Sequence, residues 1–323
     1  MVTVNTVNGN NYNILLAHIV CENMELIAEQ IKELKEELNA IILAHNYQRC
    51  EIQEMADFVG DSLGLSQQAV EQDADVIVFC GVDFMAESAA ILSPEKTVLL
   101  PVKEAHCAMS EMADAQSLRE AKAKHPDAAV VCYVNSSAAV KAESDICCTS
   151  SNAVKVVNSL DADEILFVPD MNLGKYVSRF TDKKVITWDG YCPVHHQIAA
   201  EDILLAKYEH PNAEVLVHPE CRAEVIDLAD AALSTSGMLK YVKKSPSNEF
   251  IIGTENGMLC GLKANNPGKQ FYFASPFAVC VNMKMITPTI LLESMKQMKH
   301  VVMVHEDLRE KAKLALDRML AVV

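Results

Sequence analysis

The chain has 323 residues, of which 50% are hydrophobic and 22% charged, with a formal net charge of −16. This length exceeds what one hydrophobic core usually supports, so we expect two or three globular domains rather than a single domain or a disordered chain. The negative charge argues against nucleic-acid binding, and no run approaches the roughly 20 apolar residues that a membrane span needs.

The N-terminal segment 1–13 is rich in Asn and contains no Lys or Arg. It lacks the basic start of a signal peptide, and the first 20 residues match no motif. We therefore expect a cytoplasmic protein. In that compartment the 11 cysteines would stay mostly reduced, and a cluster of them would bind metal more readily than it would form disulfides.

The first part of the chain alternates helices and short apolar strands. An amphipathic helix is predicted over 25–39, where apolar residues recur at helical spacing. Further helical segments are predicted over 51–58, 62–72 and 84–92, and strands over 41–44, 76–79 and 97–100. This alternation is typical of a parallel sheet covered by helices on both faces.

The same order of strands recurs twice more. The second copy has predicted strands over 129–132, 164–168 and 184–188, and the third has them over 214–217, 250–252 and 269–274. With right-handed crossovers, three strands per copy predict an α/β fold of three pseudo-symmetric three-layer αβα domains, each with a short parallel sheet. We place the boundaries at 1–108 plus 281–323, 109–193, and 194–280. The segment from 288 is predicted as a helix, a strand over 301–304 and a helix from 306, packed on the first domain.

Three cysteines recur at matching places in this repeat. Cys107, Cys192 and Cys280 each follow the last strand of a copy, with spacings of 85 and 88 residues. Fixed-period self-similarity is a strong organisational signal. Three equivalent thiolates around one axis would form a site for a soft metal centre. They could bind zinc with an open fourth position, or an iron–sulfur cluster with one iron free of protein ligands, and spacing alone does not separate these.

The remaining cysteines are interpreted as buried apolar thiols, because free cysteine is often buried. They are Cys21, Cys50, Cys80, Cys132, Cys147, Cys148, Cys221 and Cys260.

Polar residues follow the first strand of each copy, and a hydroxyl residue follows 17 positions later. The pairs are His45 with Ser62, Tyr133 with Ser150, and His218 with Thr235. Ligands of parallel sheets bind at the carboxyl ends of strands, which places these residues at three sheet edges. The hydroxyls precede predicted helices, where they could serve as plain N-caps or help bind a carboxylate or phosphate. Their common register favours an anionic small-molecule site.

Several motifs fall in the order found in one known family. The matching stretches are Leu43-Ala44-His45-Asn46-Tyr47-Gln48, Gly60-Asp61-Ser62, Tyr133-Val134-Asn135-Ser136, Thr149-Ser150-Ser151-Asn152-Ala153, Cys192-Pro193-Val194-His195, His218-Pro219-Glu220, Ser234-Thr235, Gly253-Thr254-Glu255 and Cys280-Val281-Asn282-Met283-Lys284-Met285. On these stretches the chain resembles quinolinate synthase, an enzyme of NAD biosynthesis, from about residue 41 to 287.

The resemblance implies a triangular protein with a central 4Fe–4S cluster bound by Cys107, Cys192 and Cys280. It implies condensation of iminoaspartate with dihydroxyacetone phosphate to give quinolinate, phosphate and water. The substrate-binding positions it implies are His45, Ser62, Tyr133, Val134, Asn135, Ser150, His218, Pro219, Glu220 and Thr235. An aspartate-oxidising enzyme is a plausible partner that would deliver iminoaspartate. Some relatives carry a Cys-x-x-Cys-x-x-Cys run at the third ligand, but Val279 precedes Cys280 here, so we expect no redox switch at that place.

The reaction needs positioned acids and bases. Our hypothesis assigns the main base to Glu220, proton shuttling to Tyr47 and a second acid or base to His195, with the neighbouring His196 as a structural or solvated control. Two rival interpretations remain at the level of the residues. One is a zinc- or iron-responsive binding protein with a saturated metal and no central cavity. The other is a module that binds sugar phosphates or acids, in which all cysteines are structural.

Overall fold

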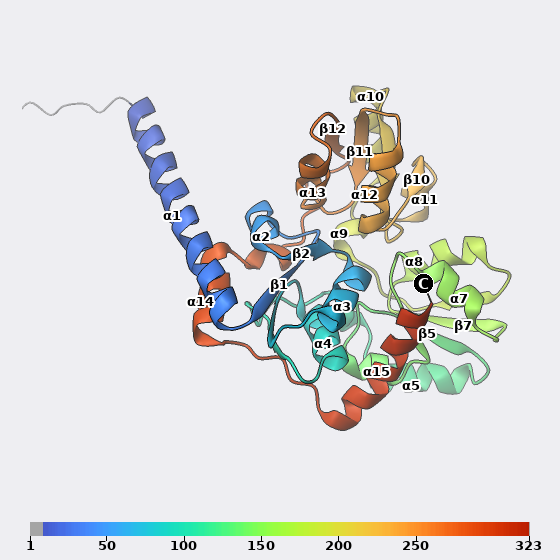
Figure 1. Ribbon diagram of the computed structural model, residues 1–323. Coiled ribbons are helices and arrows are strands. Elements are labelled where there is room, and N and C mark those ends of the chain that lie inside the picture. Colours follow the sequence, from blue (N-terminus) through green and yellow to red (C-terminus); the bar gives the residue numbers. More distant parts are fainter. Residues whose placement is uncertain (1–8, 323) are drawn as a thin grey trace, which may run out of the picture.

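A computed structural model describes residues 9–322 of the chain, with side chains described from residue 23 onward. Within that part, the strands form three four-stranded parallel sheets, one for each predicted copy (Figure 1). The first unit orders its strands β2-β1-β3-β4, the second β6-β5-β7-β8 and the third β10-β9-β11-β12, so all three share one topology. The α/β fold of three pseudo-symmetric units is therefore confirmed.

The strand bounds follow the predicted runs closely. They are β1 (Ala40–His45), β2 (Phe58–Gly60), β3 (Val76–Cys80), β4 (Thr97–Leu99), β5 (Ala129–Tyr133), β6 (Ile146–Cys148), β7 (Glu164–Val168), β8 (Lys184–Thr187), β9 (Glu214–Val217), β10 (Ala231–Ala232), β11 (Glu249–Gly253) and β12 (Gln270–Phe273). The central strands β3, β5, β7, β9 and β11 are apolar and almost wholly buried, as expected for parallel strands covered on both faces.

Helices connect the strands and form the outer layers. They are α1 (Gly9–Glu37), α2 (Cys50–Met55), α3 (Ser62–Glu71), α4 (Asp83–Leu92), α5 (Ala115–Lys124), α6 (Ala138–Ala142), α7 (Ala153–Ser159), α8 (Met171–Val177), α9 (Pro193–His196), α10 (Ala200–Glu209), α11 (Ala223–Ile226), α12 (Thr235–Lys244), α13 (Met258–Asn265), α14 (Pro288–Gln297) and α15 (Glu306–Ala321). Short 3₁₀ turns follow two of the predicted metal-binding cysteines, η1 (Ser110–Met112) after Cys107 and η3 (Met283–Met285) after Cys280. A third, η2 (Ser178–Phe180), follows α8.

The sequence underestimated each sheet by one strand. The extra strands β2, β6 and β10 have only two or three residues and lie at one edge of their sheets. Their pairing with β1, β5 and β9 comes from tertiary packing, because such short runs carry no periodic signal. Each extra strand ends shortly before Ser62, Ser150 or Thr235, which explains the common register of the three hydroxyls.

The C-terminal segment packs differently from the prediction. Helix α14 lies along α1, on the first unit (Figure 1). Helix α15 instead lies against α6 and β6 of the second unit as well as α4 of the first. The predicted strand over 301–304 is reduced to a single antiparallel bridge between Val301 and Leu99. Ala312, Ala315 and Leu316 on α15 are buried in a core shared by the first and second units, so apolar contact decided the position of this helix.

One pair of cysteines departs from the prediction of free thiols. Cys50 on α2 and Cys260 on α13 form a disulfide that joins the first unit to the third. The two residues are 210 positions apart, so the sequence carried no local sign of the pair. Cys80, Cys132, Cys147, Cys148 and Cys221 are free and buried, as predicted, and the side chain of Cys21 lies outside the described residues.

The disulfide gives a direct chemical prediction. After denaturation without reductant, a thiol-alkylating reagent should label two more cysteines in reduced protein than in unreduced protein, because reduction frees Cys50 and Cys260. In Cys260→Ser this difference should vanish, whereas the variant Cys221→Ser, at a buried free thiol, should keep it. Equal labelling of wild-type protein before and after reduction, measured by mass spectrometry, would show that the pair is not oxidised.

Candidate active site

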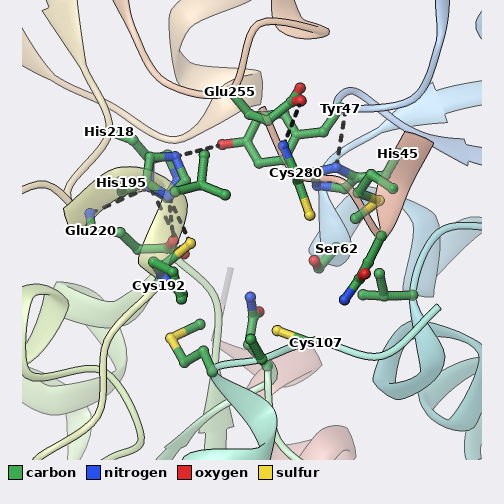
Figure 2. A pocket seen from close by; sticks show the side chains of 18 of the residues that line it. His45, Tyr47, Ser62, Cys107, Cys192, His195, His218, Glu220, Glu255 and Cys280 are labelled. Carbon is green, nitrogen blue, oxygen red and sulfur yellow. Dashed lines mark hydrogen bonds and ion pairs between the residues drawn. The ribbon is translucent and has the colours of Figure 1, made fainter. Parts of the chain in front are cut away.

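The carboxyl ends of the three sheets face one cavity of about 240 Å³. Figure 2 shows the side chains that point into it from all three units. The lining includes the predicted site residues His45, Tyr47, Ser62, Cys107, Tyr133, Asn135, Ser150, Cys192, His195, His218, Glu220, Thr235 and Cys280. The fold therefore brings together residues from 45 to 280 that the repeat selected.

The three predicted metal-binding cysteines occupy equivalent backbone positions. Cys107, Cys192 and Cys280 lie after β4, β8 and β12, and each is followed by a short helical turn. The carbonyl of each accepts a hydrogen bond from the amide four residues later, at Glu111, His196 and Lys284, with N···O distances of 3.3, 2.9 and 3.2 Å. The threefold repeat thus extends to the local hydrogen bonding of the thiol-bearing loops.

Exposure separates these three thiols from the others. Among the free cysteines of the described chain, Cys107, Cys192 and Cys280 are partly exposed, and the other five are buried. All three line the cavity, where no charged Lys or Arg side chain stands among the lining residues to pair with a thiolate. Cys107 is only partly exposed, and desolvation by the residues around it raises its pKa to about 12. A bound metal centre would supply the positive charge that stabilises three thiolates here, so the donor set fits a cluster.

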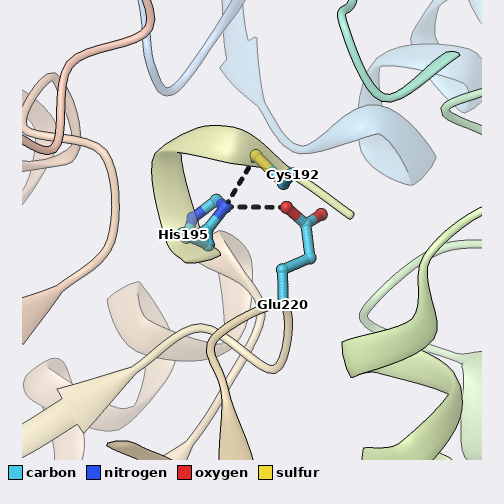
Figure 3. A group of neighbouring side chains, drawn as sticks. All are labelled: Cys192, His195 and Glu220. Carbon is cyan, nitrogen blue, oxygen red and sulfur yellow. Dashed lines mark hydrogen bonds and ion pairs between the residues drawn. The ribbon is translucent and has the colours of Figure 1, made fainter. Parts of the chain in front are cut away.

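A second group of potential metal ligands shares Cys192 with the first. The ligand atoms of Cys192, His195 and Glu220 lie within 4.8 Å of one another (Figure 3). However, Nδ1 of His195 lies 2.7 Å from Oε2 of Glu220. Two ligands of a tetrahedral zinc ion would lie about 3.3 Å apart, given metal–ligand bonds of about 2.0 Å. The shorter distance fits a direct hydrogen bond, which leaves these two side chains free for proton chemistry.

A continuous chain of proton-carrying groups crosses the cavity wall. The Tyr47 hydroxyl lies 2.6 Å from Oγ1 of Thr254, which lies 2.8 Å from Nε2 of His195. The other ring nitrogen of His195 contacts Glu220, whose Oε1 accepts a hydrogen bond from the Tyr133 hydroxyl. The groups come from the first, third and second units in turn, so the chain forms only when the three units are assembled.

The charge states along this chain are unequal. Burial raises the pKa of Tyr47 and of Tyr133 well above the ordinary value, and the nearby Glu220 adds to both effects. Both phenols are therefore neutral donors at neutral pH. Burial alone would also raise the pKa of Glu220, but the adjacent His195 and the hydrogen bonds from His195 and Tyr133 lower it below its ordinary value. Glu220 is therefore ionised and able to accept a proton.

The predicted alternative that the hydroxyls are plain N-caps is wrong for all three, since the residue at the N-cap of α7 is Asn152 rather than Ser150. Asp61 caps α3 by accepting from the Gly64 amide, and Ser234 caps α12 by accepting from the Gly237 amide. Ser62 and Thr235 are instead the first residues of these helices and line the cavity. Their hydroxyls and the helix N-termini are thus available to an anionic group.

Hydrogen bonds join the units at the cavity edge. Asn46 of the first unit donates to Oγ1 of Thr235 in the third at 2.8 Å, and Nε2 of His218 in the third lies 3.2 Å from Oγ of Ser150 in the second. Oδ1 of Asn135, in the second unit, is buried without a hydrogen-bond partner. A buried polar atom left unsatisfied beside a cavity is suited to binding a ligand.

Three residues named in the sequence analysis do not line the cavity. Val134 and Pro219 are flanked by lining residues but do not line the cavity themselves. His196, the control, faces Asn172 and Tyr191 outside it. Thr254 was missed as a functional residue although its stretch matched the family, because a threonine after an apolar strand carries no chemical signal by itself.

The buried histidines predict an acid-sensitive site. Burial lowers the pKa of His45 and of His218 to about 3, against about 6.5 in an unfolded chain. The free energy of unfolding that the two neutral imidazoles contribute is fully present above pH 6.5 and is lost as the pH falls toward 3. Below pH 6.5 each should reduce the free energy of unfolding of the metal-free chain by about 1.4 kcal/mol per pH unit.

Urea unfolding at several pH values measures this slope. The His45→Asn variant should show a shallower dependence than wild-type protein, and a matched variant at the exposed His305, His305→Asn, should keep the wild-type slope. Equal slopes for all three proteins would contradict the burial of a neutral imidazole at position 45.

Taken together, the fold and site define a three-unit α/β enzyme whose shared cavity carries three thiols, a hydrogen-bonded chain of acid–base groups and the first residues of helices α3 and α12. Among the described residues, no helix combines the length and apolar character required to span a membrane. A family model described as quinolinate synthetase A protein matches residues 29–321.

Individual relatives align with this chain over nearly their whole length. The chain is 60% identical to quinolinate synthase of Methanosarcina barkeri over 301 residues, covering 93% of this chain and 99% of the relative. It is 56% identical to quinolinate synthase of Geobacter metallireducens over 298 residues (92% and 98% covered) and 58% identical to that of Dehalococcoides mccartyi over 298 residues (92% and 99%). The chain belongs to the quinolinate synthase family, which serves NAD biosynthesis.

Proposed function

We propose that this chain condenses iminoaspartate with dihydroxyacetone phosphate to give quinolinate, phosphate and water. Family membership supports the reaction, and the single structural observation that carries it is the convergence of three equivalent thiols and an acid–base chain on one cavity. A saturated metal-binding protein would have no such cavity. A module with only structural cysteines would bury all of its thiols, whereas Cys107, Cys192 and Cys280 are partly exposed.

Cys107, Cys192 and Cys280 would bind one 4Fe–4S cluster with one iron free of protein ligands. When bound, the cluster would supply a Lewis acid that polarises a substrate carbonyl or hydroxyl. The protein's own residues carry the remaining tasks of binding the two anionic substrates, excluding water and moving protons.

Substrate binding is assigned to the polar edge of the cavity. The N-termini of α3 and α12, with the Ser62 and Thr235 hydroxyls, would bind phosphate or carboxylate groups. Ser150, His45 and His218 would donate or accept hydrogen bonds at the same edge, and Oδ1 of Asn135 would accept one from the substrate. Val134 and Pro219 would act by holding Tyr133, Asn135 and Glu220 in place.

Proton transfer is assigned to Glu220, Tyr47 and His195. Glu220 is ionised and would take a proton from a substrate carbon or nitrogen. A substrate that displaced Tyr133 or His195 from Glu220 would remove groups that lower its pKa, and so would make it a stronger base. The neutral phenol of Tyr47 would donate a proton to a leaving group and recover it through Thr254 and His195.

An anaerobic assay tests the proposal. Protein reconstituted with iron and sulfide should form quinolinate, detected by chromatography, from dihydroxyacetone phosphate and iminoaspartate. The iminoaspartate is supplied by an aspartate-oxidising enzyme, the partner chemistry we expect, together with an electron acceptor other than O₂. Omitting iron or dihydroxyacetone phosphate should abolish the product. A reconstituted, brown protein that forms no quinolinate would refute the reaction while leaving the metal site in place.

A further inference from the structure

An acidic side chain contacts the backbone of Cys107, the first of the three cysteines that line the cavity. Asp83 follows β3 and begins α4, and its Oδ1 accepts hydrogen bonds from the Phe84 amide at 2.8 Å and the Cys107 amide at 3.2 Å. Its other oxygen lies 2.9 Å from Nδ1 of His106. One carboxylate therefore joins the start of a helix to the loop that carries the thiol.

The third unit repeats this arrangement. Glu255 follows β11, and its Oε1 accepts a hydrogen bond from the Cys280 amide at 3.0 Å. Its Oε2 accepts from the Gly257 amide, near the start of α13, at 2.6 Å. Lys284 forms an ion pair with Glu255 at 3.0 Å and donates to the Tyr47 carbonyl as well. This contact also fixes the backbone of Tyr47 relative to the Cys280 loop.

The second unit has the matching residue in a more buried place. Asp170 follows β7, and its Oδ1 accepts from the Asn172 and Leu173 amides at 2.8 and 2.9 Å. Its Oδ2 is buried without a hydrogen-bond partner. The loop of Asp170 is joined to the segment before Cys192 through the backbone, because the Met171 amide donates to the Gly190 carbonyl at 2.7 Å. A Cβ on Gly190 would lie 2.4 Å from the Pro169 carbonyl, so only glycine lets the two loops approach this closely.

The three acids occupy one topological position. Each follows the third strand of its unit, and each cysteine follows the fourth strand, which pairs with the third in parallel. The carboxyl ends of neighbouring parallel strands meet at one sheet edge, so an acid after one strand reaches an amide after the next. A carboxylate that accepts a backbone N–H forms a charge-assisted hydrogen bond, which is stronger than a neutral one.

We propose that Asp83 and Glu255 are positioning residues that fix the backbone of the Cys107 and Cys280 loops, so that the sulfurs of these two cysteines face the same cavity as Cys192 before a cluster is bound. This inference rests on the proposed assignment of the three cysteines as cluster ligands. Asp83 and Glu255 act through the amides of Cys107 and Cys280, from which they accept hydrogen bonds. Residues behind metal ligands typically change metal affinity 10- to 100-fold when they are replaced.

Asp83 offers the cleanest test because its side chain is only partly buried. Asp83→Leu removes both acceptors at similar size, and Asp83→Ala removes them at a helix start that tolerates alanine. Asp83→Asn retains an oxygen that can accept from both Phe84 and Cys107 and places an amide group toward His106, so it should rescue the function. Asp202→Leu is the matched control, because Asp202 accepts one backbone amide, from Ala199 at 3.0 Å, on the remote helix α10.

Two measurements distinguish this inference from the proposed cluster site. In metal-free protein, hydrogen exchange of the Cys107 amide should be faster in Asp83→Leu and Asp83→Ala, and unchanged in Asp83→Asn and Asp202→Leu. In reconstituted protein, the rate of cluster loss to an iron chelator, followed by the decay of visible absorbance, should rise about tenfold in Asp83→Leu and Asp83→Ala only.

Each outcome decides the matter. Unchanged exchange and unchanged cluster loss in both Asp83→Leu and Asp83→Ala would overturn the positioning role, even if wild-type protein is brown. Equal acceleration in Asp202→Leu, or no rescue in Asp83→Asn, would also overturn it, because the effect would then come from general destabilisation. If wild-type protein binds no cluster, the exchange measurement still tests the inference and only the ligand assignment fails.

Discussion

Glu220→Gln is expected to lower the rate of quinolinate formation by about a thousandfold while leaving the reconstituted protein brown. Glutamine keeps the size of the side chain, but it cannot take up a proton. The hydrogen bonds that Glu220 accepts from Tyr133 and His195 hold it beside the Cys192 loop, but Glu220 is not one of the three proposed cluster ligands. We therefore expect Glu220→Gln to lose turnover while it still binds the metal centre.

The measurement compares turnover and visible absorbance in the same reconstituted sample. Glu224→Gln serves as the control, since Glu224 is four residues away, exposed, and paired only with Arg222 on the surface. Glu224→Gln should retain wild-type turnover. Full activity in Glu220→Gln would remove Glu220 from the proposed role of base, and loss of colour would assign it to the metal site instead.

Cys192→Ala is expected to abolish cluster binding, so that iron falls from about four atoms per chain to nearly none. Three protein thiolates are the minimum that holds such a cluster with one open iron, and each unit contributes one of them to the cavity. Loss of Cys192 leaves two ligands on different units, and no other cysteine of the described part of the chain lines the cavity to replace it.

Cys221→Ala is the matched control within the same part of the fold. Its thiol is buried in the core of the third unit, so the variant should be somewhat less stable but should keep its iron and its absorbance. Iron analysis and absorbance after anaerobic reconstitution check both variants. A Cys192→Ala protein with its full iron content would contradict the ligand assignment.

The sequence predicted the threefold repeat because apolar strands and cysteine spacing are periodic signals. Buried runs such as Val76-Ile77-Val78-Phe79 define central strands whatever surrounds them. The two- and three-residue edge strands escaped prediction because their pairing depends on a neighbouring strand already in place. Helix α15 was predicted to pack on the first unit alone, whereas its apolar face packs in the core between the first and second units.

The cavity followed from the same reasoning, since residues after parallel strands converge at one edge. The contacts between individual side chains did not follow from this reasoning. Thr254 bridges Tyr47 and His195, and Cys50 meets Cys260, through contacts across units that no spacing in the chain encodes. The acids behind the cysteine loops escaped notice because aspartate and glutamate after a strand are commonly solvated or helix-capping.

The most direct test of the central claim is the Mössbauer spectrum of anaerobic protein reconstituted with ⁵⁷Fe, recorded with and without quinolinate. One cysteine from each unit and one iron open to substrate predict that about a quarter of the iron absorption shifts when quinolinate binds. A spectrum in which every iron site is unchanged by quinolinate at saturating concentration, or a protein that takes up no cluster, would contradict it.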